Sequence, residues 1–181
     1  YAAGVGFGGD GKPQAGMGTD CGDVDGNGLP DLYVTNFSEE LNALYINRGR
    51  GLFEDGTVRL GLRSGYGPLG FGTRLFDMDN DTDLDIHVVN GHIIDNVEMY
   101  GTGITYAMKD LLYENVGGRF TDVSATSGPA LLADRVGRGQ AVADYDNDGD
   151  LDIAISNLGG QAVLLEGAGA NAGHWLSIRA V

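Results

Sequence analysis

The sequence of 181 residues predicts an all-β fold of repeated four-stranded units, and three observations support this prediction. Glycine is abundant, with 32 residues, whereas proline contributes only 4. Without a triplet period, so much glycine indicates many tight turns between short strands. One acidic motif occurs three times along the chain, and apolar, often β-branched residues follow each copy, as is typical of short strands.

The three copies of the acidic motif recur with a period of about sixty residues. They read GDVDGNGLPDLYVTN, FDMDNDTDLDIHVVN and ADYDNDGDLDIAISN, at residues 22–36, 76–90 and 143–157. A glycine-rich stretch precedes each copy. A weaker motif of the type LYINRGRGLFEDGT follows it, and its third version has drifted. Four short strands in a repeat of this length are typical of β-propeller blades, so we expect about three blades of four antiparallel strands.

Within each unit, the acidic loop is expected to join the first strand to the second, and an Asn-x-Gly turn to join the third to the fourth. These turns begin at Asn47 and Asn115. In the second unit the four strands are expected near residues 70–76, 84–90, 110–115 and 119–123.

No helix is expected anywhere. Residues 38–47 fit a strand better than a helical turn, and residues 91–109 form a long loop between the second and third strands of their unit. The propeller blades are expected over residues 1–172, with units at about 15–62, 68–128 and 136–180.

Each acidic loop has the pattern of a calcium site. Counted from the first aspartate, positions 1, 3, 5 and 9 offer side-chain oxygens and position 7 its backbone carbonyl, which suits a hard cation that needs six to eight oxygens. Calcium, about three ions in all, is therefore the predicted cofactor. The predicted ligands are Asp23, Asp25, Asn27, Leu29 and Asp31; Asp77, Asp79, Asp81, Asp83 and Asp85; and Asp144, Asp146, Asp148, Asp150 and Asp152.

Position 6 of each loop must turn sharply, and glycine permits the positive φ that such a turn needs. Gly28 and Gly149 fit this requirement, but the second loop has Thr82 instead. A β-branched residue at positive φ is strained, so we expect the second site to be distorted or weaker than the third. These loops are not EF-hands, because position 12 is apolar and lies in the following strand rather than being a bidentate glutamate.

Charge excludes several classes of partner. The net charge is −15, from 26 acidic and 11 basic residues, which argues against nucleic acids and anionic membrane surfaces. Three acids fall in the first loop and five in each of the others, so the carboxylates are gathered where cations would bind. The single cysteine, Cys21, excludes an intrachain disulfide and is expected to be a small buried side chain.

The acidic motifs resemble FG-GAP or VCBS repeats. The linking phrases LYINRGRGLFED and GRGQAVADYDNDGDLD resemble the cartilage acidic protein family. The closing GHWLSIRAV, at residues 173–181, resembles the truncated beginning of the ASPIC/UnbV domain that follows the repeats in that family. The resemblance implies a calcium-binding propeller, usually seven-bladed, in secreted, periplasmic or cell-surface proteins. With only three units, this chain is expected to form part of such a propeller.

Few residues suggest an enzyme. His87 and His92 lie near the second loop, but the sequence lacks the motif of a zinc protease, and we expect both, like His174, to have structural roles. No nucleophile elbow, phosphate-binding loop or dinucleotide motif occurs.

The leading hypothesis is therefore a non-enzymatic extracellular module with structural calcium. Its exposed loops, above all 91–109, would contact a protein or glycan partner, or pack against a neighbouring blade. One alternative is a structural subunit of a larger complex. The other is a propeller-based carbohydrate-active enzyme using Arg74, Arg135 or Arg138.

Overall fold

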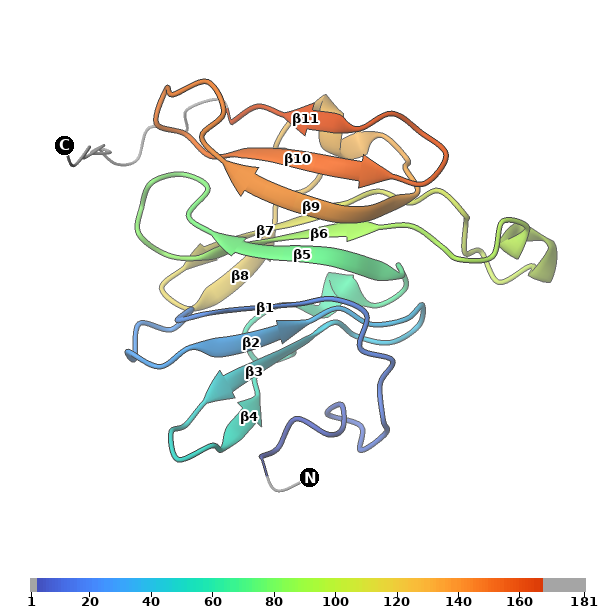
Figure 1. Ribbon diagram of the computed structural model, residues 1–181. Coiled ribbons are helices and arrows are strands. Elements are labelled where there is room, and N and C mark those ends of the chain that lie inside the picture. Colours follow the sequence, from blue (N-terminus) through green and yellow to red (C-terminus); the bar gives the residue numbers. More distant parts are fainter. Residues whose placement is uncertain (1–2, 168–181) are drawn as a thin grey trace.

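The computed structural model describes residues 3–167 of the protein. These residues form eleven strands and three short 3-10 helices, and no α-helix occurs among them. Nor is any helix in this part of the chain long and apolar enough to cross a membrane. The strands form three separate antiparallel sheets that follow one another along the chain and stack side by side (Figure 1).

The first sheet has the strand order β1-β2-β3-β4, the second β5-β6-β7-β8, and the third β11-β10-β9. Each sheet is a simple meander of antiparallel neighbours, as expected for propeller blades. The fourth strand predicted for the third unit falls outside the described residues. The bounds are β1 Thr19–Gly22, β2 Asp31–Val34, β3 Ala43–Asn47 and β4 Phe53–Asp55; β5 Gly70–Phe76, β6 Asp85–Asn90, β7 Leu111–Val116 and β8 Arg119–Asp122; β9 Gly137–Ala143, β10 Asp152–Asn157 and β11 Val163–Leu165.

The second blade confirms the strand positions predicted from the sequence to within one residue at each end. The segment 38–47 contributes β3, also as predicted. The 3-10 helices are η1 (Arg63–Gly65), η2 (Val97–Tyr100) and η3 (Pro129–Leu132). Helix η2 lies in the predicted loop 91–109, and the other two lie between the predicted units. Each is a single turn, which is too short to show the periodic pattern of apolar residues that indicates a helix in a sequence.

The first strands of the three blades lie next to one another, with β5 in contact with both β1 and β9. Glycine makes this approach possible. A Cβ atom added to Gly18, just before β1, would lie 2.1 Å from the carbonyl oxygen of Phe71 in β5. A Cβ atom on Gly72 would lie 3.1 Å from the backbone nitrogen of Gln140 in β9. The glycine-rich stretch before each acidic loop is therefore the strand at which neighbouring blades meet most closely.

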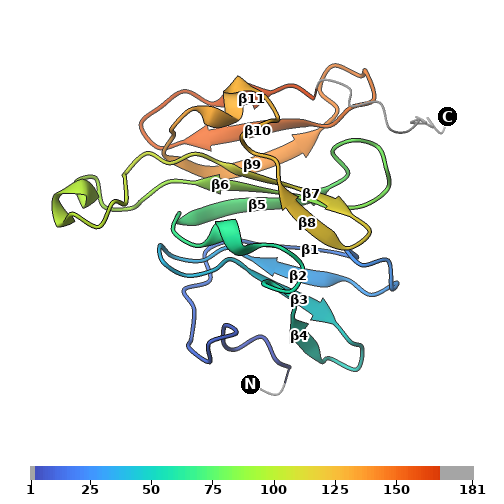
Figure 2. The same ribbon diagram turned by 180° about the vertical axis from the view of Figure 1, so that it is seen from behind.

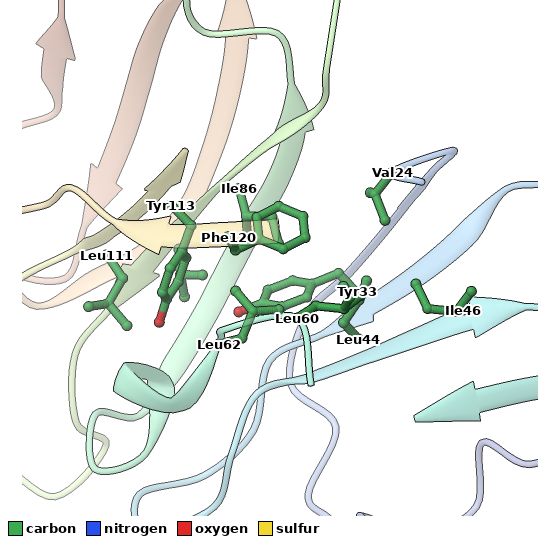
Figure 3. Close-up of a cluster of buried hydrophobic side chains, with 11 residues drawn as sticks. Val24, Tyr33, Leu44, Ile46, Leu60, Leu62, Ile86, Leu111, Tyr113 and Phe120 are labelled. Carbon is green, nitrogen blue, oxygen red and sulfur yellow. The ribbon is translucent and has the colours of Figure 1, made fainter. Parts of the chain in front are cut away.

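The middle blade is buried on both faces. In β6, Ile86 and Val88 belong to an apolar cluster shared with the first blade, and Val89 belongs to a second cluster shared with the third blade. This is the alternation expected of a strand between two cores. Figure 3 shows the first cluster, in which Tyr33 and Leu44 of the first blade lie near Tyr113 of the second.

Cys21 corrects one sequence-based expectation, because it is exposed rather than buried. It lies on β1, which is the edge strand of its sheet and pairs only with β2 among the described residues. Side chains along β1 alternate between half-buried and exposed positions, and Cys21 takes an exposed one. An edge strand buries fewer side chains than a central one, which a residue's size alone does not reveal.

Candidate metal centres

The three acidic loops lie at one end of the stacked sheets, where they join β1 to β2, β5 to β6 and β9 to β10 (Figures 1 and 2). The turns between the third and fourth strands of the first two blades reach the same end, and loop 91–109 projects from the opposite end. One end of the molecule therefore gathers most of the carboxylates that the sequence analysis singled out.

In every loop, the carboxylates at positions 1, 3 and 9 converge. Each group offers three carboxylate oxygens that all lie within 4.8 Å of one another. The groups are Asp23, Asp25 and Asp31; Asp77, Asp79 and Asp85; and Asp144, Asp146 and Asp152. The same three positions converge in all three blades, so the geometry belongs to the repeat and not to an accident of one surface.

The aspartate at position 9 is buried and fixes the loop to the rest of its blade. Asp85 is 1% exposed. Its Oδ2 accepts a hydrogen bond from the N–H of Met78 (2.8 Å), and its Oδ1 accepts one from the N–H of Asn115 (2.8 Å) at the end of the third strand. Equivalent pairs of bonds are donated to Asp31 by Val24 and Asn47 and to Asp152 by Tyr145 and Gly167.

The aspartate at position 1 closes the turn of its own loop. One oxygen of Asp77 accepts a hydrogen bond from the N–H of Asp81 (3.0 Å), and the other from the N–H of Thr82 (2.9 Å). Asp23 and Asp144 accept from the corresponding two N–H groups of their loops. These bonds hold the chain in a tight curve, which keeps the carboxylates at positions 1 and 3 on its inner side.

Two positions in each loop have a left-handed backbone. Position 6 is left-handed at Gly28, Gly149 and also at Thr82, whose φ is 80°. This confirms the strained conformation predicted for Thr82. Position 4 is also left-handed, which was not predicted from the sequence. Its residues could have indicated this, because glycine and asparagine are common in the left-handed conformation. Its residues are Gly26, Asn80 and Asn147.

Positions 5 and 7 behave differently from the converging trio. The Oδ1 of Asp81, at position 5, accepts the N–H of Asp83 at position 7 (2.8 Å), and Asn27 and Asp148 bond their loops in the same way. At position 7, the Oδ2 of Asp83 accepts the N–H of Gly117, whereas Leu29 is partly exposed. The side chain of Asp83 therefore bonds a neighbouring segment, and Leu29 has no side-chain oxygen, which leaves the backbone carbonyl as the group at position 7 available to an ion.

Burial shapes the electrostatics of the second centre most strongly. Desolvation raises the pKa of Asp85 from 3.8 to about 7, partly offset by its two N–H donors, and nearby carboxylates add to the increase. Burial also raises the pKa of Asp31 and of Asp79. A cation would remove this penalty, because it stabilises the charged form of each carboxylate.

The donor set fits a hard cation. All of the converging side chains supply carboxylate oxygen, and neither nitrogen nor sulfur belongs to any of the three groups. Such sets favour calcium, magnesium or manganese over zinc or copper. The first centre differs from the others in one respect: an Nη1 atom of Arg48 lies 3.8 Å from Asp25 Oδ2, so a positive charge already stands beside this centre.

Two histidines outside the loops, His87 and His92, are buried and take part in packing. His87 is fully buried and its Nδ1 lies 2.6 Å from Gln140 Oε1, while burial lowers the pKa of His87 to about 4. His92 is buried against the ring of Phe37. Residues 173–181, which include His174 and the stretch that resembles ASPIC/UnbV, lie outside the described residues.

Two asparagines at or near the ends of the third strands of the first two blades, predicted from the sequence only to start turns, also belong to the metal centres. Asn47 and Asn115 each donate a backbone N–H to the buried aspartate of their own centre. The phrases LYIN and LYEN could have indicated a shared role, because each opens the weaker motif that follows an acidic loop and ends in one of these asparagines.

Comparison with known protein families gives a match to part of the chain. Residues 23–88 match the model of the FG-GAP-like repeat, a span that runs from the first aspartate of the first loop to Val88 in β6. The prediction of an FG-GAP-type repeat is confirmed over these residues. No curated protein sequence matches the chain.

Proposed function

We propose that this chain is a calcium-binding β-propeller module of an extracellular protein, that its calcium is structural, and that it recognises a protein or glycan partner. The observation that carries the proposal is the convergence of three carboxylates at the same positions of three consecutive blades. An FG-GAP-like repeat that spans the first two loops supports the same function.

A structural role for calcium follows from where the ligands are attached. Asp85 joins the acidic loop to the end of the third strand through two N–H bonds, so an ion bound by Asp85 would hold both segments together. Two carboxylates about 4 Å apart repel by roughly 4 kcal/mol at an effective dielectric near 20. Binding of a cation would replace this repulsion with attraction and thereby stiffen the blade.

Loop 91–109 is the proposed contact surface for the partner. Its tip exposes large apolar side chains, with Met99 82% and Tyr100 67% exposed. The loop is nevertheless ordered by its own hydrogen bonds, because the Tyr106 N–H donates to Glu98 Oε1 (2.7 Å) and the His92 N–H donates to the Tyr106 carbonyl (2.8 Å). Exposed apolar side chains held on an ordered loop are typical of interaction sites.

The base of loop 91–109 packs against the third blade, which reconciles the two roles considered for it. Arg138 of β9 donates to the carbonyl oxygens of Gly91 and His92, and its guanidinium stacks 4.2 Å from the ring centroid of Phe71. The base therefore belongs to the interface between blades, while the tip remains exposed.

The contacts of three arginines favour a binding module over a carbohydrate-active enzyme. Arg138 is committed to carbonyl oxygens, Arg135 lies 3.1 Å from the buried Asp110, and Arg74 lies 3.7 Å from Asp20. An enzyme that stabilises an anionic intermediate needs a cation directed into a cleft.

We further propose that the parent protein belongs to the ASPIC/UnbV-containing family, on the strength of the linking phrases quoted above.

Thermal unfolding of the whole chain in millimolar calcium, in magnesium and in excess chelator tests the calcium proposal. A ligand at ten times its Kd adds about 1.4 kcal/mol per site, so three sites should raise the Tm by several degrees in calcium only. D77N and D144N should each reduce the increase. D10N, which alters an exposed aspartate outside the loops, is the matched control. An equal Tm in calcium and chelator would contradict the proposal.

A further inference from the structure

Asn115, the last residue but one of β7, is fully buried and uses all of its side-chain hydrogen-bonding groups. Its Oδ1 accepts the N–H of Gly118 (2.8 Å). Its Nδ2 donates to two carbonyl oxygens, those of Leu84 (3.0 Å) and Val24 (3.0 Å). With its backbone N–H bonded to Asp85, Asn115 has no freedom to rotate without breaking several bonds.

The two carbonyl groups that accept from Asn115 belong to different metal centres. Leu84 directly precedes the buried aspartate of the second centre. Val24 lies in the first loop, between two aspartates of the first centre, and its own N–H donates to Asp31 Oδ2 (2.9 Å). One side-chain amide therefore connects the backbone of both loops across the interface between blades.

The repeat supplies an internal comparison. Asn47 occupies the equivalent position in the first blade, but its Nδ2 donates to Pro30 of its own blade (2.9 Å). In the third blade Gly167 donates its backbone N–H to the buried aspartate and has no side chain. Among residues 3–167, Asn115 is thus the one residue of this position whose amide joins two acidic loops.

We propose that Asn115 is a positioning residue that couples the first and second calcium centres, so that an ion bound at one raises the affinity of the other. The inference rests on the proposed calcium-binding function. Its physical basis is ordering. An ion at the second centre fixes Asp85, Asp85 holds the backbone of Asn115, and the amide of Asn115 then fixes Val24. The first loop is then already partly ordered when its own ion binds, which is positive cooperativity.

The second and third loops are joined differently. Asn80 Nδ2 donates to Asp150 Oδ1 (3.0 Å), but Asp150 stands at position 7 and lies outside the converging carboxylates of its centre. This bond joins the surfaces of two loops, whereas the amide of Asn115 bonds backbone carbonyls of residues that are next to candidate ligands in the sequence. The strongest coupling is therefore expected between the first and second centres.

Calorimetric calcium titration of the whole chain tests the coupling in a background where D144N disables the third centre. D77N then leaves the first centre alone, and D23N leaves the second alone. The overall association constant with both centres intact should exceed the product of the two single-site constants by about fivefold or more. In N115A this ratio should fall to about one, whereas in the matched variant N47A it should persist.

Because N115A leaves two buried carbonyls without a donor, a second measurement keeps Asn115 intact. The NMR signal of the Gly28 N–H, which bonds to Asp23, follows calcium binding at the first centre. D77N should weaken binding there about fivefold, and D144N should leave it nearly unchanged. A ratio of one in the wild-type loops would overturn the coupling, and coupling that survives N115A would overturn the role of Asn115 in it; neither result would affect the proposed calcium binding. Absence of calcium binding at every centre would overturn the proposed function itself.

Discussion

The residue at position 9 of each loop combines two tasks that usually fall to different side chains. Asp85 is a candidate ligand of the ion and also the acceptor for two backbone N–H groups from separate segments. A carboxylate has four lone-pair directions on two oxygens, so it can accept both bonds and still face a cation. Asparagine could not, because its amide nitrogen would oppose one of the two N–H donors.

Thr82 occupies position 6 of the second loop, where the other two loops have glycine. Its φ of 80° is one that β-branched residues rarely adopt. We predict that T82G stabilises the folded protein by about 1–2 kcal/mol, because it relieves the backbone strain. The greater freedom of glycine in the unfolded chain should lower the free energy of unfolding by about 0.5–1 kcal/mol. The variant should therefore gain up to about 1.5 kcal/mol in the free energy of unfolding and bind calcium more tightly at the second centre.

Urea unfolding and calcium titration of T82G against the wild type would measure both effects. The reverse substitution in the third loop, G149T, is the matched control, because Gly149 has a φ of 96° and should resist threonine. A second centre that binds calcium less tightly in T82G would contradict the role given to backbone strain.

At the scale of elements, the segment before β7 is joined to the segment before β9 by a buried ion pair. Asp110 is fully buried, accepts the N–H of Asn90 (3.0 Å) and lies 3.1 Å from Nη1 of Arg135. Arg135 also exchanges two backbone hydrogen bonds with Met108, each 2.8 Å long. These contacts fasten the second blade, and the base of loop 91–109, to the third.

We predict that this pair makes stability depend on pH. Burial raises the pKa of Asp110 from 3.8 to about 6, although the Asn90 N–H and Arg135 act in the opposite direction. The folded protein therefore binds a proton more tightly than the unfolded chain. The contribution of Asp110 to stability is fully present below pH 4 and is lost as the pH rises towards 6 and above, with a size on the order of 1–3 kcal/mol.

Urea unfolding of the wild type and D110N in calcium-free buffer between pH 4 and 8 would isolate this contribution. Other acidic groups titrate alike in both proteins and cancel, and Arg135 stays charged throughout. The stability of the wild type relative to D110N should fall between pH 4 and 6 and stay level above pH 7. A difference that does not change with pH would show that Asp110 keeps an ordinary pKa.

At the scale of the whole molecule, the proposed metal centres and the proposed contact surface occupy opposite ends (Figure 1). We predict that M99S combined with Y100S abolishes retention on the proteins or glycans that the wild type binds in a surface-plasmon-resonance panel of extracellular proteins and neutral oligosaccharides. The Tm difference between calcium and chelator should not change, because the candidate calcium-binding residues lie at the other end of the molecule from loop 91–109.

The control for this experiment is L52S. Leu52 is also exposed, but it lies in the turn between β3 and β4, at the end that carries the acidic loops. Retention of L52S at the wild-type level is expected. Unchanged retention of the M99S and Y100S protein would remove loop 91–109 as the contact surface, while the calcium proposal would stand on its own data.

Much of the fold and of the candidate site could be predicted from the sequence. Strand positions in the second blade, the acidic loops between first and second strands, and the strain at Thr82 all follow from patterns within about fifteen neighbouring residues. Such features depend on backbone preference and on alternation along one strand, which are local properties.

Other features depend on residues far apart in the chain, and only the tertiary structure decided them. The sequence offered five candidate positions per loop, but the folded loops bring together the carboxylates of positions 1, 3 and 9. The amide of Asn115 reaches Val24 across 91 positions of sequence, and Cys21 is exposed because β1 lies at an edge. The sequence of each repeat determines the strands and turns of its own blade, because these depend on neighbouring residues. The contacts between blades depend instead on how the sheets pack against one another.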